Sequence, residues 1–147
     1  MASNLNFDKF AKEAYDYVTE LARDLGHPNE KERILKIWRA VMHTVRDRIH
    51  IGESMQLMHP LPMIFKGIYV ENWQYNEKPP KDFNTIEEMK KEVKAVQAQY
   101  GEEDFPWEKS TEEIISITIN SLSRFMQGNQ LEDIKDQLPK EIKELVH

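Results

Sequence analysis

Cysteine is absent from the 147-residue sequence. This absence excludes disulfides, thiolate zinc sites, iron–sulfur clusters and cysteine nucleophiles. Long hydrophobic runs are absent too. The most apolar segment, residues 57–70, is interrupted by a histidine, two prolines and a lysine, so it falls short of the roughly 18 apolar residues of a membrane span. The sequence also does not open with the charged and then apolar segments of a secretion signal. We therefore expect a cytoplasmic protein without a membrane span.

Basic residues are outnumbered by acidic ones. The sequence has 20 Lys and Arg against 26 Asp and Glu, a net charge of −6. The excess lies in residues 79–147, where fifteen acidic residues exceed nine basic ones by six. Because nucleic-acid binding depends on neutralising phosphates, an acidic protein is a poor candidate for it. A composition of 39% hydrophobic and 31% charged residues is typical of a folded globular protein.

Most catalytic motifs are missing as well. The sequence has no glycine-rich phosphate loop, no His-Glu-x-x-His and no Gly-x-Ser-x-Gly. One Glu-x-x-His match, Glu144 to His147, falls in a C-terminal turn that we expect to fray, so it is a weak metal-site candidate. We therefore expect no catalytic residues, no metal site and no cofactor.

Helical periodicity is what the sequence does contain. Apolar residues recur every three or four positions over 7–25, 34–49, 86–100 and 114–126, as on one face of a helix. Short helices are expected over 53–58 and 62–70, and the second should be the most buried because it is apolar nearly all round. Capping boxes are predicted at Asn29 with Glu32, Thr85 with Glu88, Ser110 with Glu113 and Asn129 with Glu132. The β-branched residues of 114–119 also suit a strand, but the Ser110 box favours a helix.

Residues 28–69 and 108–146 follow one pattern. Aligning Leu61-Pro62 with Leu138-Pro139 also places Leu57 on Ile134 and Phe65 on Ile142. At nearly the same offset, Gly26 and Gly101 each follow the first long helix of a half. We therefore predict an all-α, single-domain helical bundle over 1–147. It would consist of two tandem structural repeats, about 1–78 and 79–147, each with two long and two short helices.

A row of basic residues is the first candidate site. At spacings of three and four, opposite the apolar stripe of the second long helix, lie Lys36, Arg39, His43, Arg46 and His50. Such a row can bind an anionic ligand or an acidic protein. The alternative is a helix face that pairs with Asp and Glu of a neighbour. The alignment of the two halves places Glu113, Ser116, Asn120, Ser123 and Gln127 at the same positions, so the scaffold does not require basic residues there.

Apolar residues around the first Leu-Pro form the second candidate. Met58, Met63, Phe65 and Trp73 can line a pocket between the repeats that carries an apolar small molecule. Ordinary core filling is the alternative. Phe105 and Trp107, in the segment before the last long helix, are expected either to cover the seam between the repeats or to anchor a partner.

The run from Arg33 to Arg48, RILKIWRAVMHTVRDR, followed by LPMIFKGIY and Trp73, resembles the bacterial domain of unknown function number 2267 family. The opening NFDKF and the later QLP fit the same pattern, so the resemblance covers nearly the whole chain. It implies an all-helical, tandem-repeat bacterial protein of the cytosol, and it brings no catalytic residue, substrate or cofactor.

Our leading hypothesis is a non-enzymatic interaction module that binds a protein or anionic partner through the Lys36 to His50 row. A carrier of an apolar small molecule is the alternative, and an uncharacterised enzyme is the third. The partner and the oligomeric state stay open.

Overall fold

The structure is a computed structural model that describes residues 7–74, 76–102 and 104–146. All regular secondary structure in these ranges is helical, which confirms the predicted all-α class. The elements are α1 (Phe7–Asp24), α2 (Lys31–Arg46), α3 (Ile51–Met58), α4 (Met63–Tyr69), α5 (Ile86–Gln99), α6 (Thr111–Asn120), the short 3-10 helix η1 (Ser121–Arg124), α7 (Gln130–Lys135) and α8 (Lys140–Leu145). The β-branched segment 114–119 lies in α6, as expected. Within the described ranges, no helix combines the length and apolar composition needed to cross a membrane.

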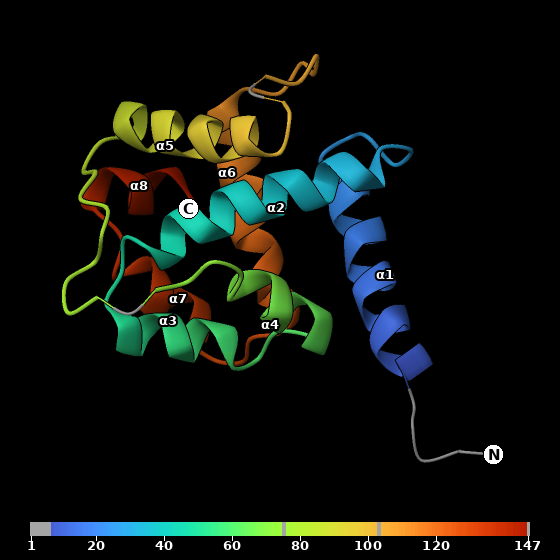
Figure 1. Ribbon diagram of the computed structural model, residues 1–147, viewed down its shortest axis with the longest axis horizontal. Helices are drawn as coiled ribbons and strands as arrows, with labels where there is room; N and C mark the ends of the chain where they lie inside the picture. Colours follow the sequence, from blue (N-terminus) through green and yellow to red (C-terminus); the bar gives the residue numbers. More distant parts are fainter. Residues whose placement is uncertain (1–6, 75, 103, 147) are drawn as a thin grey trace.

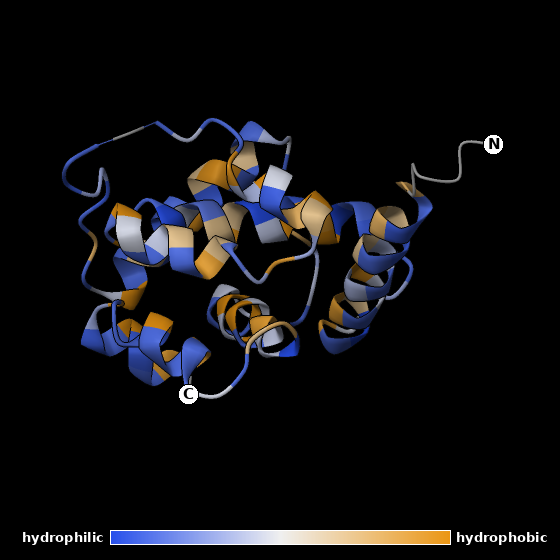
Figure 2. Ribbon diagram, turned by 90° about the horizontal axis from the view of Figure 1, so that it is seen from below, coloured by the Kyte–Doolittle hydropathy of each residue, from blue (hydrophilic) through white to orange (hydrophobic). Residues whose placement is uncertain are grey.

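The second helix, α2, is the centre of the bundle. It packs against α1, α4, α5 and α6, and Figure 1 shows it crossing the middle of the molecule between α5 and the α3–α4 pair. Ten of its residues are buried. Figure 2 shows hydrophobic and hydrophilic residues alternating along the helices, the pattern expected when one face of each packs inward.

The prediction that the helix over 62–70 is the most buried is wrong. Of the seven residues of α4, Phe65 and Tyr69 are buried, whereas Met63 and Ile64 are 52% and 39% exposed. A helix of two turns covers its neighbours with one face, and this face of α4 meets α1 and α2. Its remaining apolar residues therefore stay in contact with solvent.

Local signals fix some helix ends and not others. The Ser110 hydroxyl accepts from the Glu113 backbone N–H at 3.2 Å and the Thr85 hydroxyl from Glu88 at 3.1 Å, so these two predicted caps form. The box at Asn29 is wrong: α2 begins at Lys31 with Glu30 as N-cap, and no side chain of the described residues caps it. Asn129 is the N-cap residue of α7, again without a side-chain cap.

Glycines end the first long helix of each half, as predicted. Gly26 follows α1 with φ +83° and Gly101 follows α5 with φ +99°. Both angles lie in the left-handed region that a side chain disfavours, which is why glycine terminates a helix there.

One buried tyrosine forms hydrogen bonds to residues of both halves. The Trp38 indole N–H donates to the Tyr17 hydroxyl at 2.9 Å, and Tyr17 donates to Ser121 Oγ at 2.5 Å, because the Ser121 hydroxyl proton is directed to the Thr118 carbonyl. The Phe65 ring packs edge-on against both Tyr17 and Trp38, with centroids 4.9 and 4.8 Å away. Burial raises the pKa of Tyr17 to about 12.

The helix caps give a first test. Replacing Ser110 by alanine removes an observed cap, and we expect the free energy of unfolding to fall by about 1 kcal/mol. Asn129→Ala is the matched control, because its side chain makes no cap, and it should cost less than about 0.5 kcal/mol. Urea unfolding followed by circular dichroism measures both. Equal losses for the two variants would contradict these helix boundaries.

Candidate functional site

Arg46 of the basic row is buried against the end of α4. Its side chain is 4% exposed, and its Nη1 donates to the carbonyls of Tyr69 and Glu71 at 2.7 and 2.8 Å. The last carbonyls of a helix lack intrahelical partners and carry partial negative charge. Arg46 therefore caps α4 from another helix. The Asp47 carboxylate binds Arg46 Nε at 2.8 Å and balances its charge.

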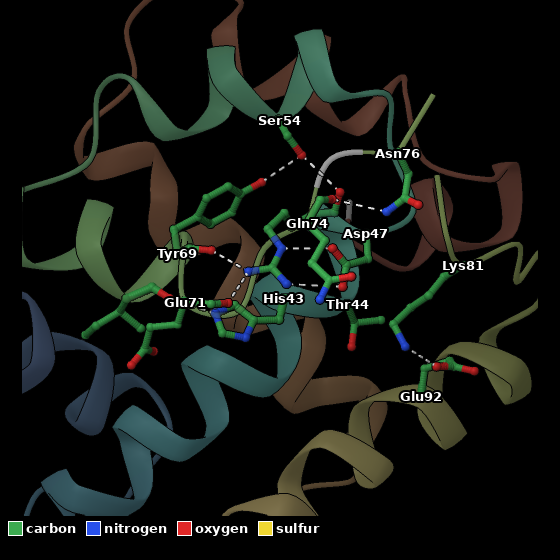
Figure 3. A network of polar contacts seen from close by, with 12 residues as sticks. His43, Thr44, Asp47, Ser54, Tyr69, Glu71, Gln74, Asn76, Lys81 and Glu92 are labelled. Atoms are coloured by element: carbon green, nitrogen blue, oxygen red, sulfur yellow. Dashed lines mark hydrogen bonds and ion pairs between the residues drawn. The ribbon is translucent and has the colours of Figure 1, made fainter. Parts of the chain in front are cut away.

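His43 binds the same end of α4. Its Nε2 lies 2.7 Å from the Ile68 carbonyl oxygen, and since a carbonyl only accepts, the ring nitrogen donates. The residue is 6% exposed, and burial lowers the pKa of its imidazole, so the neutral ring is favoured. Figure 3 shows His43 beside Glu71 and below Tyr69, within the polar network.

A short chain of hydroxyls extends this network to α3. Tyr69 donates to Ser54 Oγ at 3.1 Å, and Ser54 donates to the Arg46 carbonyl at 3.0 Å, as Figure 3 shows for the labelled pair. Burial raises the pKa of Tyr69 above its ordinary range. The Arg46 guanidinium lies over the Trp73 ring, with its central carbon 5.7 Å from the ring centroid. These contacts join α2, α3 and α4 and leave the Arg46 charge shielded from solvent.

The other three residues of the row also contact their own chain. Lys36 pairs with Glu102 of the second half at 3.0 Å, and this hydrogen bond lowers the pKa of Glu102. Arg39 pairs with Glu71 at 2.8 Å. His50 accepts from the Gly52 N–H at 3.2 Å and so caps α3. Every member of the row is thus occupied within the chain, and its binding of a partner stays a prediction.

The second half binds the matching carbonyl with neutral groups. Leu145, at the end of α8, is the counterpart of Ile68 in the alignment of the two halves, and its carbonyl accepts from Ser116 Oγ at 3.3 Å. Asn120, the counterpart of His43, donates to Ser116 Oγ at 3.4 Å. At matching positions of the sequence alignment, the Ile68 and Leu145 carbonyls thus each accept a side-chain hydrogen bond. In the first half the donor is the imidazole of His43, and in the second half it is the hydroxyl of Ser116.

The four residues of the predicted apolar pocket differ in their surroundings. Phe65 is 1% exposed in the core, and Met58 packs partly buried against the core. Trp73 lines a small hollow with Arg46, whereas Met63 lines a larger groove elsewhere.

That groove, of about 540 Å³, lies between α1, the 60–62 turn, the start of α4 and η1. Its apolar lining includes Phe10, Leu61, Met63 and Phe125, from both halves of the chain. The α1 residues 10, 13, 17 and 20 that line it follow helical spacing, so sequence could have marked this face. The opposite wall could not be found this way, because residues 60–66 and 124–125 reach it only through packing.

Most charges around the groove are paired. Arg124 pairs with Glu20 and, at 2.9 Å, with Asp24, while Asp16 pairs with Lys12 at 2.8 Å. Glu13 on α1 and Lys66 on α4 line opposite walls, and in the part of the chain that the structure describes neither side chain has a hydrogen bond or an ion pair. No group of three or more His, Asp or Glu within residues 7–74, 76–102 and 104–146 could hold a metal ion.

The loop aromatics fix the segment before α6. The Trp107 ring stacks on His27 with centroids 4.0 Å apart and donates to Glu30 at 2.8 Å. Phe105 stacks on Trp107, and the Arg33 guanidinium lies over Phe105. These contacts attach the loop of the second half to the start of α2. They favour the prediction that Phe105 and Trp107 cover the seam between the two halves over the prediction that they anchor a partner.

Residues 14–145 match the model of the family described as "Uncharacterized conserved protein (DUF2267)". No curated protein matches the chain. The matched range includes the whole basic row and most of the groove.

Arg46 gives a second test. We expect Arg46→Met to lower the free energy of unfolding by about 3 kcal/mol, because the α4 carbonyls and Asp47 lose a buried cation. Lys36→Met removes a charge from the same row at a side chain that is 29% exposed and should cost far less. Urea denaturation measures both. Equal stability of the two variants would exclude a capping role for Arg46.

His43 predicts a pH dependence. Its pKa is lower in the folded chain than its ordinary value near 6.5, so the unfolded chain binds more protons below that pH. The His43 contribution to stability is therefore complete above pH 6.5 and is lost as the pH falls through the folded-state pKa. His43→Gln should flatten the loss of stability between pH 7 and 5. His59→Gln, at an exposed position, should leave the profile unchanged; matching profiles for His43→Gln and the wild type would contradict this assignment.

Proposed function

The chain belongs to the DUF2267 family, and we propose that it is a non-enzymatic interaction module that binds a helical protein segment in the groove beside α1. The observation that carries this proposal is the groove itself. Its apolar lining includes Phe10, Leu61, Met63 and Phe125, and of these Met63 is 52% exposed. Exposed apolar surface rimmed by polar residues marks interaction sites more often than isolated apolar side chains do.

The proposal moves the binding surface from the basic row to the groove. An anionic partner at the row would have to displace Glu102 from Lys36 and Glu71 from Arg39. Arg46 is bound to carbonyls and is 4% exposed, so it has no free donor directed at solvent. These contacts favour a structural role for the row.

The shape of the groove favours a helix as its occupant. One wall is α1, whose groove residues recur at positions 10, 13, 17 and 20, and the opposite wall includes the first turn of α4. Two helical walls with an apolar floor accommodate an amphipathic helix that inserts side chains at i, i+3, i+4 and i+7. The hydrophobic floor would supply affinity, and the charged rims would select orientation.

An apolar small molecule is the second candidate for the groove. Its volume of about 540 Å³ falls in the range of small-molecule sites, roughly 300–1,000 Å³. Native mass spectrometry of protein purified from its own host distinguishes the two. A bound small molecule that is lost in Met63→Glu supports the carrier, and an unliganded mass together with peptide binding supports the module.

The two-repeat, single-domain organisation is part of this proposal. Long and short helices occur in the same order in both halves, and Pro62 and Pro139 each precede the last short helix. One hydrophobic cluster includes core residues of both halves. The Ile68 and Leu145 carbonyls, bound at matching places, support a duplicated design. Work in a bacterial cytoplasm stays a prediction from the sequence.

Display of a library of amphipathic helical peptides tests the proposed function. We expect the wild-type protein to enrich helical peptides, and we expect Met63→Glu to abolish their binding because it places a charge in the apolar groove. Met55→Glu is the matched control: Met55 on α3 is 48% exposed, close to the 52% of Met63, so neither change should unfold the protein. Failure to enrich any peptide, or equal binding by Met63→Glu, would contradict the proposal.

A further inference from the structure

We propose that the occupant of the groove is a second copy of this chain, in a symmetric dimer where Glu13 of each copy pairs with Lys66 of the other. This inference rests on the proposed function, since it uses the same groove. It adds the identity of the partner and the charge pair that orients it.

The two unpaired charges carry the inference. Around the groove, Asp16, Glu20 and Arg124 have partners in their own chain. Glu13 and Lys66 line opposite walls, and among the described residues neither has a side-chain partner. In a two-fold contact each surface meets itself, so residue i contacts j of the partner and j contacts i. A surface with one acidic and one basic wall therefore complements its own copy and gains two ion pairs.

Exposed apolar surface continues from the groove to the N-terminal turn of α1. Phe7 is 68% exposed and lies one turn before Phe10, on the same side of the helix. Figure 1 shows this end of α1 standing away from the other helices. Across the groove, Met63 and Ile64 are exposed at the start of α4. The molecule thus has a projecting apolar helix end beside an apolar groove, and a second copy supplies the projection that fills it.

Other occupants account for less of the surface. An apolar small molecule fills the groove and leaves Glu13 and Lys66 without partners. A foreign helix needs a cation and a carboxylate at matched positions, whereas a second copy has both by symmetry. The net charge of −6 on each copy opposes association through long-range repulsion, which salt screens, so local pairing of opposite charges is the feature that orients the dimer.

Sedimentation equilibrium from about 1 µM to 1 mM, at an ionic strength of about 0.15 M, tests the dimer. The wild-type mass should rise with concentration from 17.5 kDa toward twice that value. Glu13→Lys and Lys66→Glu each create two like-charge contacts and should each weaken dimerisation by about ten-fold or more. The double variant exchanges the charges and should restore association to near the wild-type value. Lys140→Glu, an exposed change of the same charge on α8, is the control and should leave the dimer intact.

The outcomes separate this inference from the proposed function. A wild-type protein that stays monomeric at the highest concentration overturns the dimer, and helical peptides that still bind in a Met63-dependent way leave the interaction module intact. A dimer that the double variant fails to restore overturns the Glu13–Lys66 pairing. Circular dichroism confirms that each variant keeps its helices, so a loss of association reports on the surface.

Discussion

The Tyr17 hydroxyl is the contact on which the arrangement of the helices depends. It accepts from Trp38 of α2 at 2.9 Å and donates to Ser121 of η1 at 2.5 Å, so one buried group joins α1 to both halves of the chain. Leaving such a group without partners costs about 1–3 kcal/mol, and a shift of any of the three elements along its axis would incur this cost. The Phe65 and Phe125 rings pack edge-on against the same tyrosine at 4.9 and 4.8 Å. Because Tyr17 and Phe125 also line the groove, the contacts that fix the core also fix the shape of the candidate binding surface.

The sequence predicted the helices because helix formation is governed by signals a few residues apart. Apolar periodicity located the long helices, and Ser110 capped α6 because its hydroxyl needs only a nearby backbone N–H in the first turn. The Asn29 box failed because Glu30 is the N-cap residue instead, and its carboxylate binds Arg33 and Trp107. Trp107 belongs to the other half of the chain, and no local pattern could indicate its contact. The exposure of α4 was also not predictable from local sequence. The composition of a helix does not determine which of its faces pack against other helices.

The basic row shows the same division between spacing and packing. Four of its members lie on α2, whereas His50 lies beyond the end of α2 and is the N-cap residue of α3. Most of their partners come from segments that only the tertiary fold brings near. Lys36 meets Glu102, and His43 and Arg46 meet the end of α4. The alignment of the two halves gave the useful sequence signal, because Glu113 and four neutral residues stand at the matching positions and none of them is a cation. In the second half Ser116 binds the corresponding carbonyl of Leu145, so the shared requirement is a hydrogen-bond donor for the end of a short helix.

Charge that is paired within the fold is less available for binding, so we place the proposed binding surface by its unpaired charges and not by charge density. The row places Lys36, Arg39 and Arg46 on one helix, yet Arg46 is enclosed by the Tyr69 and Glu71 carbonyls and the Trp73 ring. Glu13 and Lys66 belong to no such row, and the fold supplies neither with a partner among the described residues. An unpaired charge at the surface is well solvated and costs the folded state little, so it can be kept for an ion pair with another molecule. In the proposed dimer, the apolar groove between these two charges would also be buried. Its burial would add the hydrophobic stabilisation that an ion pair alone lacks.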